Sequence, residues 1–244
     1  VFKGKTALTG ITIGNQVKSI ADSAFEGCSG LKFVTFKETG KDETEVALTI
    51  GAKSFKSCSS LTSLTLPTRL TSIGANAFQS CSKITSVVIP EGVTTIGDSA
   101  FASCNALVSV SLPSTLKALA TSTSSKKGAM LVFDSCSSLA YITVASGNTA
   151  YAAEDNLLYK LTAKKDDAGN TAYVKTTLLY CPWMKGGSTD VVLPDTLTEI
   201  ATYAFDRNKN VTSVVIKDAE GFTMGVNAFY DCEKMTAITL PVGL

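Results

Sequence analysis

Apolar positions recur along the chain with a period of 23 residues, the distance from Phe55 to Phe78. The repeating pattern is F-x-x-C-x-x-L-x-x-L-x-L-P-x-x-L-x-x-I-G-x-x-A. A fixed period between about 20 and 50 residues is the signature of a repeat architecture. We therefore predict a solenoid in which each unit packs on its neighbours. One slot of the repeat holds phenylalanine throughout, at Phe2, Phe25, Phe55, Phe78, Phe101, Phe133, Phe205 and Phe229.

Each repeat contains a short segment in which apolar and polar residues alternate, such as Leu64, Thr65 and Leu66. Alternation with a period of two is typical of a strand with one buried face. Because each unit returns the chain in the same direction, we expect these segments to stack into one parallel sheet about 40 Å long. The segments are Leu8–Ile13, Leu31–Phe36, Leu61–Leu66, Ile84–Ile89, Leu107–Leu112, Leu139–Val144, Ser188–Leu193, Val211–Ile216 and Met235–Leu240.

The second half of each repeat, such as LTSIGANAF, is predicted to return along the opposite side. Leu70, Ile73, Ala77 and Phe78 should point inward and close the core. The slot that holds Gly74 holds alanine in other repeats, so it requires a small residue more than a positive φ. The segment is too short for a long helix, and we expect short strands with turns of 3-10 helix.

Three insertions interrupt the period. Residues 37–45 are charged, and residues 121–128 have the composition of a flexible loop. The third insertion lies between Phe133 and Phe205, where two apolar-aromatic runs flank a KKDDAGN turn. This pattern predicts a β-hairpin near residues 148–183. The hairpin either replaces a rung of the solenoid or protrudes from it, and the sequence leaves both arrangements open.

The motif A-F-x-x-C-x-x-L-x-x-[IVL]-x-L-P-x-x-[LV]-x-x-I-G is carried by residues 77–97, 100–119 and 204–225. It resembles the BspA-like leucine-rich repeat, and the resemblance covers nearly the whole chain. The departures are Lys5 and Asn208, which stand in the cysteine slot, and the two added loops. The resemblance implies a right-handed α/β solenoid with a parallel sheet on its concave face and short strand or 3-10 segments on its convex side.

The repeats predict a single domain over residues 1–244. Both ends of the sequence fall inside a repeat, so we expect this domain to be part of a longer array. The resemblance implies an extracellular or cell-surface protein of bacterial or mucosal-protist type, with a role in adhesion or host-protein binding. That role is an analogy, because one fold hosts many functions.

Charge and residue type restrict the chemistry. The net charge of +1 gives no electrostatic footprint for nucleic acid, and no apolar run is long enough for a transmembrane helix. The chain has no histidine, which removes histidine-based acid–base catalysis and histidine metal ligands. We predict no catalytic residue, no metal site and no cofactor.

Six cysteines share one slot of the repeat, and Cys181 lies in the hairpin insertion. Stacked slots lie within disulfide range, so a disulfide ladder or a metal site is one interpretation. The other is a column of buried free thiols that pack as small apolar residues. We favour the thiols because stacked side chains point the same way and no C-x-x-C spacing occurs. The six are Cys28, Cys58, Cys81, Cys104, Cys136 and Cys232.

The strand register predicts two outward rows, one from Gly10 to Ala237 and one from Thr12 to Thr239. These rows are rich in hydroxyl groups and nearly uncharged, and solenoids often bind ligands on such a surface. The alternative is that threonine and valine occupy these rows only because they favour strands. Aromatic residues such as Phe33 and Tyr141 need another explanation, because they are enriched at binding hot spots. The predicted ligand-binding residues are Phe33, Ser63, Thr65, Ser86, Ser109, Tyr141 and Thr143.

The hairpin insertion concentrates aromatic residues, including Tyr159, Tyr180 and Trp183. These three residues form a possible secondary patch for a partner or a sugar. The alternative, which we favour, is that they pack the hairpin against the solenoid.

The leading hypothesis is a non-enzymatic, monomeric cell-surface protein that binds a host or matrix protein, or a glycan, without inserting into a membrane. The first alternative is an architectural solenoid that presents another domain. The second is a part of a glycan-processing surface enzyme, which the missing histidine and the lack of a converging polar cluster disfavour.

Overall fold

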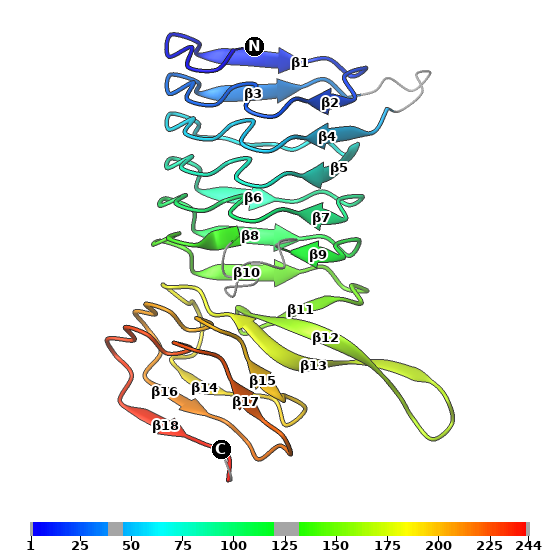
Figure 1. Ribbon diagram of the computed structural model, residues 1–244, viewed down its shortest axis with the longest axis vertical. Helices are drawn as coiled ribbons and strands as arrows, with labels where there is room; N and C mark the ends of the chain where they lie inside the picture. The colour runs from blue at the N-terminus through cyan, green and yellow to red at the C-terminus, as the bar shows by residue number, and fades with distance from the viewer. Residues whose placement is uncertain (1, 39–45, 120–131, 243–244) are drawn as a thin grey trace.

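The computed structural model describes residues 2–38, 46–119 and 132–242, which form a stack of β-rungs (Figure 1). The described residues contain no α-helix, and turns link the strands, so the expected α/β repeat is a β-solenoid. Outside the described residues lie 39–45 and 121–128, nearly all of the two expected loops. One side of the stack carries β1 (Gly10–Ile13), β3 (Phe33–Phe36), β6 (Ser86–Val88), β8 (Ser109–Leu112), β10 (Tyr141–Val144), β14 (Asp190–Val192), β16 (Ser213–Val215) and β18 (Ala237–Thr239).

The strand register on this side is the one predicted from the repeat. Gly10 pairs with Phe33, and Ser109 pairs with both Ser86 and Tyr141. Eight of the nine predicted segments form strands, whereas segment 61–66 makes only an isolated bridge from Ser63 to Phe33. The expectation of one continuous sheet is wrong, because the pairing divides into β1-β3, β6-β8-β10 and β14-β16-β18.

Most strands on the opposite side are only two residues long. As predicted, Leu70, Ile73, Ala77 and Phe78 are buried there. A Cβ atom on Gly74 would lie 2.7 Å from backbone atoms of the preceding rung, so this slot requires a small residue because the rungs approach closely. The strands are β2 (Ser19–Ile20), β4 (Leu48–Ile50), β5 (Leu70–Ile73), β7 (Thr95–Ile96), β9 (Ala118–Leu119), β15 (Glu199–Ile200) and β17 (Thr223–Met224).

The phenylalanine slot forms a column of stacked rings through the core. Phe78 lies between Phe55 and Phe101, with centroid distances of 5.3 and 5.4 Å and nearly parallel planes. After Phe133 the next ring is Tyr180 from the hairpin, at 6.1 Å. The hairpin insertion therefore supplies an aromatic ring where the repeat pattern itself has none.

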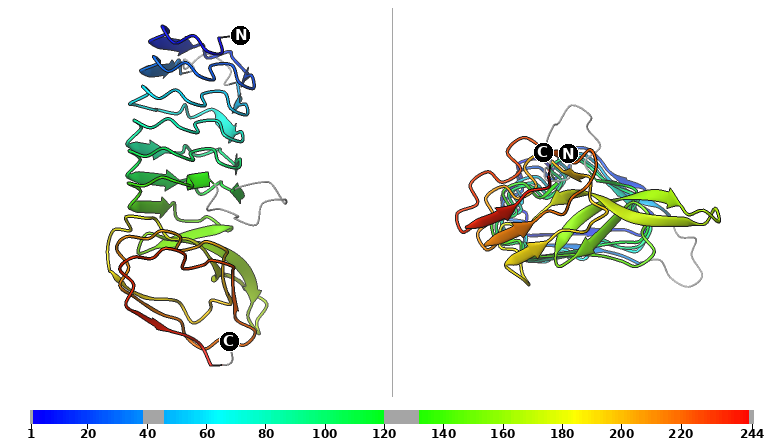
Figure 2. Two further views of the ribbon diagram at one scale, coloured as in Figure 1. Left: turned by 60° about the vertical axis from the view of Figure 1, so that its left-hand side comes forward. Right: turned by 90° about the horizontal axis from the view of Figure 1, so that it is seen from below.

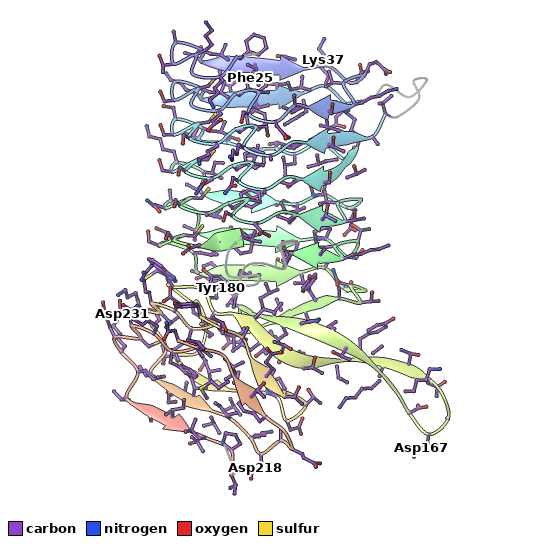
Figure 3. All side chains as sticks on the ribbon, viewed as in Figure 1. Phe25, Lys37, Asp167, Tyr180, Asp218 and Asp231 are labelled. Carbon is purple, nitrogen blue, oxygen red and sulfur yellow. The ribbon has the colours of Figure 1, made fainter. Side chains whose placement is uncertain are left out.

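The insertion consists of β11 (Tyr151–Glu154), β12 (Leu157–Lys165) and β13 (Thr171–Tyr180), which pair in antiparallel order. The base of β13 then pairs in parallel with β15, so the hairpin takes a place in the stack. Its distal half, with Asp167 near the tip, extends from the body (Figures 1–3). The hairpin thus both replaces part of a rung and protrudes.

The base of the hairpin separates two hydrophobic cores. Leu158 and Tyr180 pack with the N-terminal rungs, whereas Leu157, Tyr159 and Leu178 pack with the C-terminal rungs. Neighbouring side chains of a strand point to opposite faces, so this sheet is buried on both sides at its base. Beyond it, β14 does not pair with β10, and the last rungs are inclined to the first ones (Figure 2).

The cysteine slot contains hydrogen-bonded free thiols. Each Sγ donates to the carbonyl oxygen of the phenylalanine one repeat earlier, as from Cys81 to Phe55 at 3.2 Å. Burial raises the pKa of Cys58 and Cys104 to about 12, which keeps these thiols protonated. In the same slot, the buried amide of Asn208 donates to the carbonyl oxygen of Pro182 at 2.6 Å.

Candidate binding surface

The outward positions of β1, β3, segment 61–66, β6, β8 and β10 make up one surface, which we call the strand face. Its positions are exposed or partly exposed, and the residues between them point into the core. Eight of the twelve are serine or threonine, and none is charged. The twelve are Gly10, Thr12, Phe33, Thr35, Ser63, Thr65, Ser86, Val88, Ser109, Ser111, Tyr141 and Thr143.

Two hollows flank segment 61–66 on the strand face. One, of about 380 Å³, is lined by Ser63, Thr65 and Ser86, and the other, of about 310 Å³, by Phe33, Ser63, Thr65 and Glu38. They occur where the strand ladder is interrupted, since β6 is the edge of its sheet and faces the unpaired part of segment 61–66. The structure therefore brings four of the seven predicted binding residues together at segment 61–66 and the two hollows beside it, namely Phe33, Ser63, Thr65 and Ser86.

The other three predicted residues lie farther along the same face. Ser109 is on β8, and Tyr141 and Thr143 are on β10. The hydroxyl of Thr143 donates to that of Ser111 at 3.0 Å, across neighbouring rungs. Hydroxyl groups both donate and accept, so this row can form hydrogen bonds to a ligand in either sense.

Phe33 lies over a glycine of the neighbouring rung. A Cβ atom on Gly10 would stand 2.2 Å from the Phe33 ring, so the ring occupies the space that a side chain would fill. The ring is nevertheless 53% exposed. The missing side chain at position 10 thus lets one part of the ring rest on the sheet while the rest faces solvent.

Tyr141 repeats this arrangement at the other end of the face. A Cβ atom on Gly186 would stand 2.3 Å from the Tyr141 ring, which is 48% exposed. Gly186 is held there because its N–H donates to the carbonyl oxygen of Ala140 at 2.9 Å. Next to it, the fully buried ammonium of Lys185 donates to Asp155 Oδ2 at 2.7 Å and to the carbonyl oxygens of Gly186 and Ser188.

The aromatic patch predicted on the hairpin is not a surface. Tyr159 and Tyr180 are each 1% exposed and pack in the two cores, as the packing alternative requires. Burial raises the pKa of both phenols well above the usual value. Trp183 is partly buried, and the guanidinium of Arg207 lies 5.3 Å from its ring centre.

The C-terminal rungs have a different outer surface. Asp190 stands in the row of Phe33 and Tyr141 and accepts hydrogen bonds from the hydroxyls of Thr212 and Ser213. These bonds lower the pKa of Asp190, so a carboxylate interrupts the row here. The uncharged surface therefore ends at β10.

Within residues 2–38, 46–119 and 132–242, no group of three or more His, Cys, Asp or Glu side chains is placed to hold a metal ion. Nor do these residues include a helix with the length and apolar character needed to cross a bilayer.

Sequence reasoning found the outward rows but missed the supports beneath the aromatic rings. Gly10 and Phe33 are neighbours in the predicted register, so an aromatic residue beside a glycine was a usable signal. The support of Tyr141 by Gly186 had no such signal, because Gly186 belongs to no repeat slot. The hollows also depend on the broken ladder, which the regular pattern of residues 61–66 does not indicate.

The repeats identify the family. The chain matches the family model described as BspA type leucine rich repeat region (6 copies), over residues 1–126, 48–160 and 184–244. The matches extend over most of the sequence, and the chain belongs to this family. The chain matches no curated protein sequence.

Several solved structures are similar. The pneumococcal vaccine antigen PcpA is 26% identical, with a TM-score of 0.76 over 97% of this chain and 51% of its own. A leucine-rich cell surface protein from Faecalibacterium prausnitzii is 25% identical, with a TM-score of 0.60 over 96% of this chain and 61% of its own. A leucine-rich repeat protein from Bacteroides ovatus is 26% identical, with a TM-score of 0.64 over 97% and 56%. The chain spans 51% to 61% of the length of these three structures.

Proposed function

We propose that this protein is a non-enzymatic, extracellular recognition module that binds a ligand on the strand face and serves adhesion at the cell surface. In this proposal the solenoid is right-handed, the strand face is its concave side, and the module acts as a monomer. The ligand is a host or matrix protein, or a glycan. Two similar proteins are described as a vaccine antigen and a cell surface protein, which supports the location.

The observation that carries the proposal is the pair of half-exposed aromatic rings on an otherwise hydroxyl-rich face. Phe33 and Tyr141 expose 53% and 48% of their surface although each has a glycine backbone to rest on. Exposed aromatic residues of this kind are enriched at binding hot spots. The two hollows beside Ser63 also indent the face between Phe33 and Tyr141, where a ligand can be partly enclosed.

A binding array of matrix proteins and glycans tests the proposal. The wild-type protein and the Phe33→Ala and Tyr141→Ala variants are applied to the same array. We expect the variants to lose the ligands that the wild type retains. The matched control is Tyr173→Ala, because Tyr173 is equally exposed at 48% but lies on β13. Binding that survives in both face variants would remove the strand face as the binding surface.

A further inference from the structure

We infer that the ligand of the strand face is an uncharged oligosaccharide that lies along the solenoid axis and stacks on Phe33 and Tyr141. This inference rests on the proposed function and specifies the class of ligand. Three properties of the described surface support it: its charge, its hydrogen-bonding groups and the way in which its rings are held.

The charge of the face selects an uncharged ligand. None of its twelve positions is charged, and the charged residue that lines the two hollows is Glu38, which lines the same hollow as Phe33. An acidic sugar placed in this hollow would lose solvation and would face the Glu38 carboxylate. Acidic peptide segments meet the same penalty.

The hydrogen-bonding groups of the face are hydroxyls. Ser63, Thr65, Ser86 and Ser109 present groups that both donate and accept. β8 is paired with β6 on one side and with β10 on the other, so its backbone offers no template for an added peptide strand. Sugar hydroxyls also both donate and accept, so they can form hydrogen bonds with such a row whichever partner supplies the proton.

The two aromatic rings are supported from below. Gly10 of β1 leaves room for the ring of Phe33, and Gly186 of the loop before β14 leaves room for the ring of Tyr141. A ring supported in this way offers a flat apolar surface rather than a flexible side chain. The C–H face of a pyranose ring fits such a surface, while its hydroxyls reach the serine and threonine side chains.

The distance between the rings sets the length of the ligand. Phe33 and Tyr141 belong to the repeats that begin at Phe25 and Phe133, four rungs apart. In the core column that runs from Phe25 to Phe133, the distances between successive ring centres are 5.3, 5.3, 5.4 and 6.3 Å. Four rungs therefore rise by about 20 Å. A disaccharide reaches one ring only, and a chain of several sugars is needed to contact both.

Calorimetric titration with neutral oligosaccharides tests the inference. The probes are cellohexaose, N-acetylchitohexaose and a panel of other neutral hexasaccharides, with cellobiose as the short comparator and hexagalacturonic acid as the acidic one. We expect at least one neutral hexasaccharide to bind at least tenfold more tightly than its disaccharide. Hexagalacturonic acid should not bind.

Variants separate stacking from folding. Phe33→Ala and Tyr141→Ala should each weaken binding of the hexasaccharide at least tenfold, and Tyr173→Ala should leave it within twofold. Gly10→Ala keeps the Phe33 ring but displaces it, and it should also weaken binding. Circular dichroism confirms that each variant is folded.

The outcomes distinguish the two proposals. If no neutral oligosaccharide binds but a protein ligand is lost in Phe33→Ala and Tyr141→Ala, the inference fails and the proposed function stands. Preferential binding of the acidic probe, or neutral binding that survives in both face variants, also overturns the inference. If neither sugars nor proteins bind through this face, the proposed function fails as well.

Discussion

Replacement of Phe78 by alanine tests whether the aromatic column stabilises the solenoid. Phe78 is fully buried and stacks on Phe55 at 5.3 Å and on Phe101 at 5.4 Å. Truncation of a buried phenylalanine costs about 3–5 kcal/mol. Two stacked pairs, each worth about 0.5–1.5 kcal/mol beyond its area, place Phe78 in the upper part of this range, so we expect a loss of about 4–5 kcal/mol in the free energy of unfolding.

Phe2 provides the matched comparison within the same column. It is 48% exposed and, among the rings of the described residues, stacks on Phe25 alone, at 5.3 Å. About half of the transfer free energy and one stacked pair are lost in Phe2→Ala, which gives about 1–3 kcal/mol. Both values can be measured by urea unfolding at equal m-values. A loss below about 1 kcal/mol for Phe78→Ala, or equal losses for the two variants, would refute the reasoning.

Four further predictions concern the turns, the thiols and the buried lysine. Ser103 has a φ of 59° where Gly27 stands at 75° in an earlier repeat, so Ser103→Gly should stabilise the protein by about 1 kcal/mol in urea unfolding, and destabilisation would contradict this. Folding raises the pKa of Cys104 from 9.0 to about 12, so this thiol loses its proton at lower pH in the unfolded chain than in the folded protein. The urea midpoint should therefore fall as the pH rises above 9, and it should fall less steeply in Cys104→Ala. Equal slopes in the two proteins would show that Cys104 does not cause the loss of stability. Thiol titration after unfolding without reductant should give about seven thiols, and two or fewer would show disulfides. Lys185→Met leaves Asp155 without its partner and should cost about 2–4 kcal/mol, whereas a neutral effect would show that this ion pair contributes little.

The repeat made most of the fold predictable. A 23-residue period with alternating apolar residues fixes which side chains enter the core, so Leu70, Ile73 and Phe78 could be assigned from sequence. The same alternation fixed the outward positions of Phe33 and Tyr141. These assignments needed only local pattern, because every repeat meets the same neighbours.

The features that were not predicted depend on contacts between unlike segments. The run Leu157-Leu158-Tyr159 is buried at every position, because one face of the hairpin packs against the N-terminal core and the other face packs against the C-terminal core. Continuous apolar runs are typical of strands covered on both sides, but the run alone does not identify which cores cover it. The role of Tyr180 in the aromatic column has the same origin, since the hairpin carries no repeat motif.

The interruption at segment 61–66 is also a property of the stack rather than of the segment. Its sequence, LTSLTL, has the regular pattern, yet only Ser63 bridges to a neighbouring strand. The rungs on the opposite side remain paired from β5 to β7 at this level. The opening is therefore confined to the strand face, where the two hollows lie.

Hydrogen–deuterium exchange of the ligand-bound protein tests the central claim most directly. Segment 61–66 has no strand pairing beyond the bridge at Ser63, so the amides of residues 64–66 should exchange readily in the free protein. With the tightest ligand from the binding array present, we predict protection of segment 61–66 and of the adjoining β3 and β6. Unchanged exchange there, with protection on β12 and β13 instead, would contradict the strand face as the binding surface.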